Sequence, residues 1–363
     1  MNQRYLQHYL KFCSLVGTFP LGRQGGSWFY SKLNTVSTLC HSVFHAASSL
    51  ILMKQSVFVD ESELIARLIY AYLEPPLLPV LFLFVWLLKE TMLKNYLALD
   101  KHVFSEGKSA EFYPKSILLH FGGIVLTSIL LVFNQINRNY LNVLVDYKFL
   151  ILVVQLLSIS MQVSWVLRIG TKSLETIYDN LALVEDPSYA DIRRTIKTHE
   201  FTTDVLESFV EGYGPLILIT TPLCLMEITA ICSVVIYNIQ HGYILKVLID
   251  LCWLTLLALT VGEMINACME ASQQAEKFNK LLAACALKDE SEKIVLNPYI
   301  YMHFATKKTL TFTACKCFNI DYRLGCSMVA ACVTYLVILL QFDGPKNPRT
   351  TGLPPNITDS FKN

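Results

Sequence analysis

Charged residues are scarce in this chain of 363 residues. Only 16% are Asp, Glu, Lys or Arg, whereas a soluble globular domain usually carries about 25%. Hydrophobic residues make up 53% of the chain, and the mean hydropathy is +0.43. This shortage of charge argues against a soluble domain and favours a membrane protein. The formal net charge of +1 is too small to indicate a polyanionic partner, so we expect no binding to nucleic acid.

Signatures of catalytic and cofactor sites are missing as well. The sequence contains no phosphate-binding loop, no glycine-rich nucleotide fingerprint and no H-E-x-x-H motif. Cys315 and Cys317 lack a second ligand pair at zinc spacing, so we interpret them as reduced thiols in a packed segment. We therefore expect no enzymatic activity, no metal and no cofactor. The N-terminus lacks an apolar core followed by a cleavage site, so we expect no signal peptide.

Long apolar runs are what the sequence does contain. About 20 apolar residues are needed to cross a bilayer as a helix. The stretches that reach or approach this length are 34–53, 64–88, 116–134, 147–167, 214–238, 243–263 and 325–342. We therefore predict an all-α membrane protein with seven transmembrane helices. Prolines interrupt the second and fifth stretches, which predicts that these helices face protein or water there rather than lipid.

The basic residues indicate how the chain is oriented. Of the 30 Lys and Arg residues, 22 lie in four segments that would share one side of the membrane: 1–33, 89–115, 168–213 and 264–324. Because basic residues accumulate on the cytoplasmic side, we predict a cytoplasmic N-terminus and an extracellular C-terminus. All 11 cysteines then fall in spans or cytoplasmic segments, so we expect no disulfides. The sequon at Asn356 lies in the outer tail and is a candidate glycosylation site.

Polar side chains recur in the outer half or near the middle of the first six predicted spans. A charge at mid-bilayer costs about 2.5–3.5 kcal/mol on insertion scales, so such residues usually have a use. With neighbouring aromatic residues, we interpret them as the lining of an outward-facing cavity for a small ligand. The candidates are His45, Tyr70, Tyr72, Glu74, Asn134, Gln155, Glu227, Asp250 and Trp253. The alternative is pairing within the chain, since Lys246 and Asp250 lie one turn apart.

The last predicted span carries a narrow stripe of small and polar residues on one helical face. The stripe consists of Ser327, Ala331, Thr334, Ile338 and Gln341. Several copies around an axis would form a water-lined tube, with Ile338 as a hydrophobic ring that can gate by dewetting. Gln341 and Phe342 would lie at the outer mouth, and Asp343 would add carboxylates, which favour cations. A helix that packs its small residues on other spans explains the stripe equally well.

Thr334-Tyr335, five apolar residues and Gln341-Phe342 resemble the T-Y-(five apolar)-Q-F signature that ends the last helix of insect gustatory receptors. The preceding segment "FTACKCFNIDYRL" (312–324) is similar to the family's segment before that helix. "LVGTFPL" (15–21) resembles the family's common N-terminal segment. Lys316 departs from the family, which often has glycine there. The predicted spans and orientation also fit the family.

The resemblance implies a gustatory receptor subunit that works as a ligand-gated, nonselective cation channel. Such subunits assemble as homo- or hetero-tetramers in the plasma membrane of sensory neurons, surrounded by lipid, and each contributes its last helix to a central pore. The resemblance places Gln341 and Phe342 at the gate, a small-molecule tastant in the outer half of the first six helices, and a shared anchor in the cytoplasm. Base rates in the family favour a bitter or otherwise aversive ligand, although the carboxylates and Trp253 would also suit a sugar.

These expectations divide the chain into a cytoplasmic N-terminal segment, a ligand-binding bundle, an anchor, a pore helix and an extracellular tail. The N-terminal segment is 1–33, and the ligand-binding bundle is 34–263, with cytoplasmic loops at 89–115 and 168–213. The anchor is 264–324, the pore helix is 325–342 and the extracellular tail is 343–363. Two other functions stay open on the residues alone. One is a G-protein-coupled receptor, and the other is a secondary transporter whose helices break at Pro75, Pro76 and Pro222.

Overall fold

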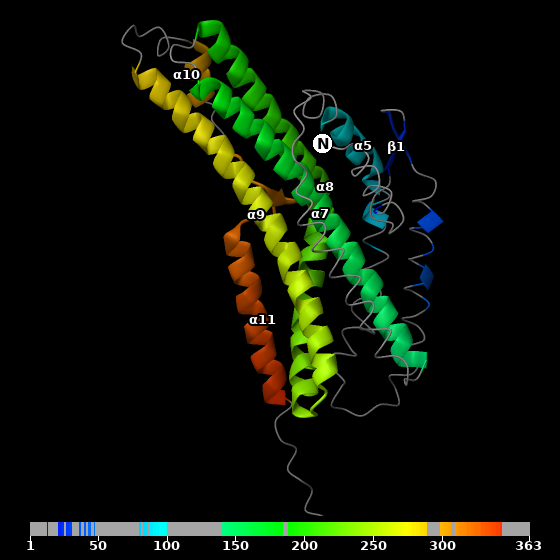
Figure 1. Cartoon of the computed structure of the whole chain (residues 1–363). Coiled ribbons are helices and arrows are strands. Elements are labelled where there is room, and N and C mark those ends of the chain that lie inside the picture. The colour runs from blue at the N-terminus through cyan, green and yellow to red at the C-terminus, as the bar shows by residue number, and fades with distance from the viewer. Residues whose placement is uncertain are drawn as a thin grey trace, which may run out of the picture.

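The fold is described from a computed structural model of the chain. The described residues are Cys13, 21–24, 27–30, scattered positions within 36–47 and 80–87, and then 88–99, 140–183, 188–288, 298–305 and 309–342. They are mostly helical, as predicted, and long helices run side by side along the molecule (Figure 1). Two short antiparallel hairpins add a little strand to the predicted all-α fold. They are β1 (Leu21–Gln24) with β2 (Ser27–Tyr30), and β3 (Thr313–Ala314) with β4 (Phe318–Asn319).

Four of the predicted spans fall on described helices. These helices are α7 (Tyr140–Ala182), α8 (Tyr189–Gln240), α9 (Ile244–Lys288) and α11 (Tyr322–Phe342). The first three are long and apolar enough to cross a membrane, and α11 is apolar but shorter over Tyr322–Ile338. The predicted spans 34–53, 64–88 and 116–134 lie wholly or mostly outside the described residues.

The long helices extend well beyond a bilayer. The 52 residues of α8 span about 78 Å at 1.5 Å per residue, against a hydrocarbon core of about 30 Å. The segment 168–213, expected to be a loop, is therefore mainly the end of α7 and the start of α8. Ser188 caps α8 by accepting a hydrogen bond from the backbone N–H of Asp191. The helices continue because each keeps a buried apolar face here, as Leu174 of α7 and Ile192 of α8 show.

The exposed face of α9 changes from apolar to charged along its length. Leu248 and Leu259 are exposed in its first half, whereas Glu276 and Lys280 form an exposed ion pair at 3.0 Å in its second half. Near the change, the Arg168 guanidinium of α7 lies 3.9 Å from the Glu263 carboxylate of α9. Apolar side chains suit contact with lipid and charged ones suit water, so this level marks where the helices would leave the hydrocarbon core.

Two shorter helices complete the described part of the chain. Helix α5 (Lys89–Leu99) packs on α8, where Asn95 Nδ2 donates to the Ser208 carbonyl at 3.0 Å and Tyr96 contacts Phe209 edge to face. Helix α10 (Pro298–Ala305) lies at the end of the molecule opposite the C-terminal end of α11 (Figure 1). The buried apolar core follows the contacts among α7, α8 and α9.

Candidate functional site

Helix α11 packs on α8 and α9. Met328 is buried in this contact, and the Thr229 hydroxyl of α8 lies 3.5 Å from the Cys332 thiol of α11. Gly325 brings the start of α11 close to α9, since a Cβ there would lie 3.5 Å from Ile265 Cδ1. The attached face therefore follows residues 325, 328 and 332.

The predicted polar stripe lies mainly away from this attached face. Ser327, Thr334, Ile338 and Gln341 are exposed and Ala331 is half-buried, so the described part of the chain leaves most of the stripe uncovered. The Thr334 hydroxyl donates to the Ala330 carbonyl at 2.8 Å, which leaves its oxygen lone pairs as the outward polar feature. Large apolar side chains are also exposed on α11, namely Val329, Val333, Tyr335 and Val337. Exposure alone therefore fits both a pore lining and a surface for lipid or another subunit.

Helix α11 ends at the predicted gate. Gln341 is exposed in its last turn, and Phe342 is its final residue. The side chain of Phe342 and the whole of Asp343 lie outside the described residues. Their predicted roles at the mouth of a pore stay predictions.

A tight hairpin forms the base of α11. The Cys317 N–H donates to the Ala314 carbonyl at 2.9 Å, and the two residues between them, Cys315 and Lys316, have φ of 50° and 60°. Two successive left-handed residues fit a type I′ turn, which matches the twist of a two-stranded hairpin. Lys316 thus takes the left-handed conformation that glycine adopts without strain. The family that this chain resembles often has glycine at this position.

The hairpin is fixed to both long helices beside it. A Cβ on Gly214 of α8 would lie only 3.0 Å from the backbone nitrogen of Cys315, so the turn rests directly on α8. On the other side, Ser272 of α9 donates to the Leu310 carbonyl at 2.6 Å. The Asp321 carboxylate then accepts the N–H groups of Arg323 and Leu324 and caps α11. The position of α11 is therefore tied to α8 and α9 at its base.

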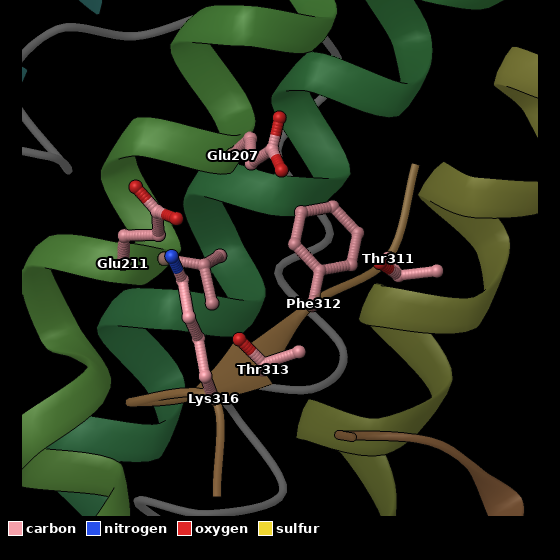
Figure 2. Close-up of a pocket in the computed structure, with 7 residues that line it drawn as sticks. Glu207, Glu211, Thr311, Phe312, Thr313 and Lys316 are labelled. Atoms are coloured by element: carbon pink, nitrogen blue, oxygen red, sulfur yellow. The ribbon is translucent and has the colours of Figure 1, made fainter. Parts of the chain in front are cut away.

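A small cavity of about 140 Å³ lies between α8 and this hairpin (Figure 2). Its lining combines the carboxylates of Glu207 and Glu211, one turn apart on α8, with the Lys316 ammonium and two threonine hydroxyls from the hairpin. The full lining is Glu207, Val210, Glu211, Thr311, Phe312, Thr313 and Lys316. Ligand pockets usually measure about 300–1,000 Å³, so this cavity suits water or a small ion rather than a drug-sized molecule.

Four of the predicted pocket residues can be placed, on α7, α8 and α9. Gln155 and Glu227 are completely buried and Trp253 is 2% exposed, whereas Asp250 is half-buried. Glu227 lies 13 residues from the end of α8, about 20 Å along the helix axis, and Asp250 lies 6 residues from the start of α9, about 9 Å. Because α8 and α9 meet at one turn, these two carboxylates lie at different depths below it.

The Asp250 carboxylate has a partner that the sequence analysis missed. Asn238 Nδ2 of α8 donates to Asp250 Oδ2 of α9 at 2.8 Å, across the turn that joins the two helices. The Lys246 ammonium, suggested as the partner of Asp250, lies 4.4 Å from the centre of the Tyr243 ring. The sequence did offer a signal for this contact, because Asn238 and Asp250 are polar residues at similar distances before and after the turn between the two helices. The predicted residues His45, Tyr70, Tyr72, Glu74, Asn134 and Asn356 lie outside the described residues.

Comparison with known proteins gives one sequence family and one fold. The sequence profile of the family described as 7tm Chemosensory receptor matches residues 6–344. No curated protein sequence matches this chain. The fold is similar to the insect olfactory receptor OR5 from Machilis hrabei, with a TM-score of 0.61 and 12% identity over 94% of this chain and 98% of that chain. The structure of that receptor in complex with eugenol is similar with a TM-score of 0.55 and 10% identity over the same shares of both chains.

Proposed function

Because the chain belongs to the 7tm chemosensory receptor family, we propose that it is a gustatory receptor subunit that works as a ligand-gated, nonselective cation channel. The observation that carries this proposal is α11, whose polar stripe lies mainly away from the face attached to α8 and α9. The T-Y…Q-F signature of the same helix, from Thr334 to Phe342, supports a gustatory rather than an olfactory receptor. We place the subunit in the plasma membrane of sensory neurons.

The proposed pore forms when four subunits, identical or related, bring their α11 helices around one axis. Thr334 and Gln341 then present hydroxyl and amide oxygens to passing cations, and Ile338 forms a hydrophobic ring between them. Gln341 and Phe342 act as the gate at the outer mouth, and Asp343 adds a ring of carboxylates that favours cations. The exposed Val333 of α11 is directed away from this axis and contacts lipid.

The proposed ligand is a small organic molecule, and we favour a bitter or otherwise aversive compound. It binds between the first six spans, where Gln155, Glu227, Asp250 and Trp253 contribute to the lining together with the predicted residues of the first three spans. The related OR5 structure in complex with eugenol supports a small organic molecule as the ligand. A few polar side chains such as Glu227, set among apolar and aromatic ones, would orient the ligand and give the pocket its selectivity.

The coupling between pocket and gate runs through the base of α11. Ligand binding that shifts α8 against α9 moves the contacts at Gly214 and Ser272, and these contacts hold the hairpin from which α11 starts. The ligand opens the channel only if it binds the open arrangement more tightly than the closed one. The hairpin has little freedom to absorb such a shift, since its turn contacts α8 at Gly214 and the segment just before it is held to α9 by Ser272.

The test is to express the chain in cells, alone and with related subunits, and to record membrane current during a broad screen of tastants. Gln341→Ala and Phe342→Ala should change gating or leak current, because both residues lie at the proposed gate. Val333→Ala, on the exposed apolar part of α11, is the matched control and should leave the current unchanged. The pore assignment is wrong if the channel responds to a tastant and both gate variants behave as wild type.

Orientation and glycosylation are tested separately. Tags at the two termini, probed on intact cells, should reveal the C-terminus but not the N-terminus. The opposite pattern would favour a G-protein-coupled receptor. Asn356→Gln should remove a glycan from the outer tail, seen as a shift in electrophoretic mobility.

A further inference from the structure

Helix α10 is held in place by a partly buried polar cluster, in which the Glu200 side chain is 47% exposed, at the end of the molecule remote from the gate. It has only eight residues, Pro298–Ala305, and an isolated helix of that length is not stable in water. His303 extends from α10 between α8 and α9 and is 6% exposed. This ring is one of the attachments of α10, beside the buried side chain of Ile300 and the Tyr299 hydroxyl, which accepts a hydrogen bond from Arg193 of α8.

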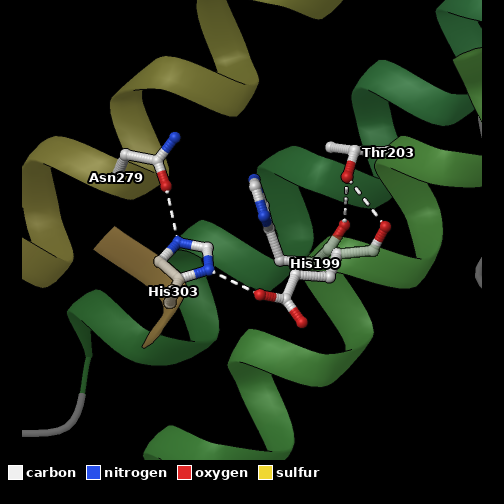
Figure 3. A network of polar contacts seen from close by, with 5 residues as sticks. His199, Thr203, Asn279 and His303 are labelled. Atoms are coloured by element: carbon white, nitrogen blue, oxygen red, sulfur yellow. Dashed lines mark hydrogen bonds and ion pairs between the residues drawn. The ribbon is translucent and has the colours of Figure 1, made fainter. Parts of the chain in front are cut away.

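Both nitrogens of His303 face oxygen atoms (Figure 3). Nδ1 lies 2.7 Å from Glu200 Oε1 of α8, and Nε2 lies 2.8 Å from Asn279 Oδ1 of α9. A carboxylate and an amide oxygen can only accept hydrogen bonds, so the ring satisfies both contacts only when it carries a proton on each nitrogen. A neutral ring loses one of them unless the Asn279 amide turns over to donate instead. The charged ring also forms an ion pair with Glu200.

Other titratable groups on the elements packed against α10 are His199 and Arg193 of α8. His199 of α8 stacks on Phe278 of α9 at 4.1 Å, with its ring centre 6.2 Å from that of His303. Burial, and then the nearby His303, lower the pKa of His199 to about 4, so this ring is neutral at pH 6–8. Arg193 of α8 binds α10 at a separate point, where its Nη2 donates to the Tyr299 hydroxyl at 2.7 Å. From α9 the ring meets Asn279 and Phe278, which do not titrate.

We propose that the His303–Glu200–Asn279 cluster is a proton-operated clamp that fastens α10 to α8 and α9 more tightly when His303 is doubly protonated. Gain of a proton makes both hydrogen bonds possible at once and adds the attraction of Glu200. Only residues 306–312 separate α10 from the hairpin at the base of α11, and the Leu310 carbonyl in that connection is held by Ser272. That the clamp senses cytosolic pH rests on the proposed orientation.

Hydrogen–deuterium exchange of the purified full chain in nanodiscs tests the clamp without needing a ligand or a current. After correction for the intrinsic effect of pH on exchange, the amides of 302–305 should exchange about tenfold more slowly at pH 6 than at pH 8. A tenfold change corresponds to about 1.4 kcal/mol, and we expect no larger effect because the Glu200 side chain is 47% exposed and screened by water. This pH dependence should vanish in His303→Gln, which cannot gain a proton. It should weaken in Glu200→Gln, which keeps the shape of the carboxylate without its charge.

His241→Gln is the matched control, because His241 is exposed at the other end of α8, where its Nδ1 lies 2.8 Å from the Tyr237 carbonyl. It should retain the full pH dependence. The exchange of amides 253–268 in α9 reports whether each variant is folded. If His303→Gln loses protection from exchange there, the test of the clamp rests on Glu200→Gln instead. The clamp is refuted if the wild-type chain shows no pH dependence at 302–305, or if folded His303→Gln or Glu200→Gln keeps the full effect. A failed current recording, by contrast, would count only against the channel.

Discussion

Replacing Gly214 with alanine tests whether the hairpin at the base of α11 is held rigidly against α8. The new Cβ would lie 3.0 Å from the backbone nitrogen of Cys315 and 3.3 Å from its Sγ. Alanine is better than glycine inside a helix by about 1 kcal/mol, whereas overpacking costs about 1–3 kcal/mol. The turn cannot easily move away by itself, because Ser272 of α9 holds the segment just before it at the Leu310 carbonyl. We therefore expect a net loss of stability of up to about 2 kcal/mol.

Gly262→Ala is the matched control, since Gly262 also lies inside a long helix and a Cβ there would meet no atom of the described residues within 4 Å. This variant should gain about 1 kcal/mol from helix propensity alone. The measurement is the thermal unfolding midpoint of each full-length variant in the same detergent. The midpoint of Gly214→Ala should fall below wild type and that of Gly262→Ala should rise above it. A Gly214→Ala variant as stable as Gly262→Ala would show that the hairpin does not rest on α8 as described.

The remaining predictions use the same unfolding measurement. Lys316→Gly should raise the unfolding midpoint, because a non-glycine residue in the left-handed conformation costs about 1–2 kcal/mol. Lys316→Val should lower the midpoint. Equal midpoints for these two variants would contradict the left-handed turn. The pKa of His199 is about 4 in the folded chain against an ordinary 6.5, so the unfolded chain binds more protons and stability should fall by about 3 kcal/mol as pH drops from 6.5 toward 4. His199→Phe should flatten this slope, and an unchanged slope would place the cause elsewhere. Asn238→Ala should cost about 1–3 kcal/mol by removing the donor to Asp250, and a neutral effect would argue against that bond.

The positions of the described long helices were predictable from the sequence, because a long apolar run is the strongest signal that a membrane helix leaves. Their ends were not. Residues 189–213 carry charges such as Arg194 and Asp204, which interrupt the apolar run, while Ile196 and Leu206 keep a buried face of the same helix. A search for uninterrupted apolar length misses such a two-faced helix, whereas a search for helical spacing would find it.

The candidate site was predictable where it depends on spacing within one helix. The stripe from Ser327 to Gln341 falls mainly on the exposed side of α11, as helical spacing requires, and its place in a pore stays a prediction. Contacts between distant parts of the chain left no such pattern. His303 meets Glu200 across 103 positions, and Ser272 meets Leu310 across 38. A single sequence shows which residues can form such bonds but not which ones meet.

An experimental structure of the assembled complex in a lipid nanodisc measures the central claim most directly, because it shows what the free side of α11 faces. We predict four chains around one axis, with Thr334 and Gln341 of each α11 directed at the axis and Val333 directed away from it. A complex in which Thr334 and Gln341 face lipid, or in which no continuous passage runs beside α11, would contradict the proposal.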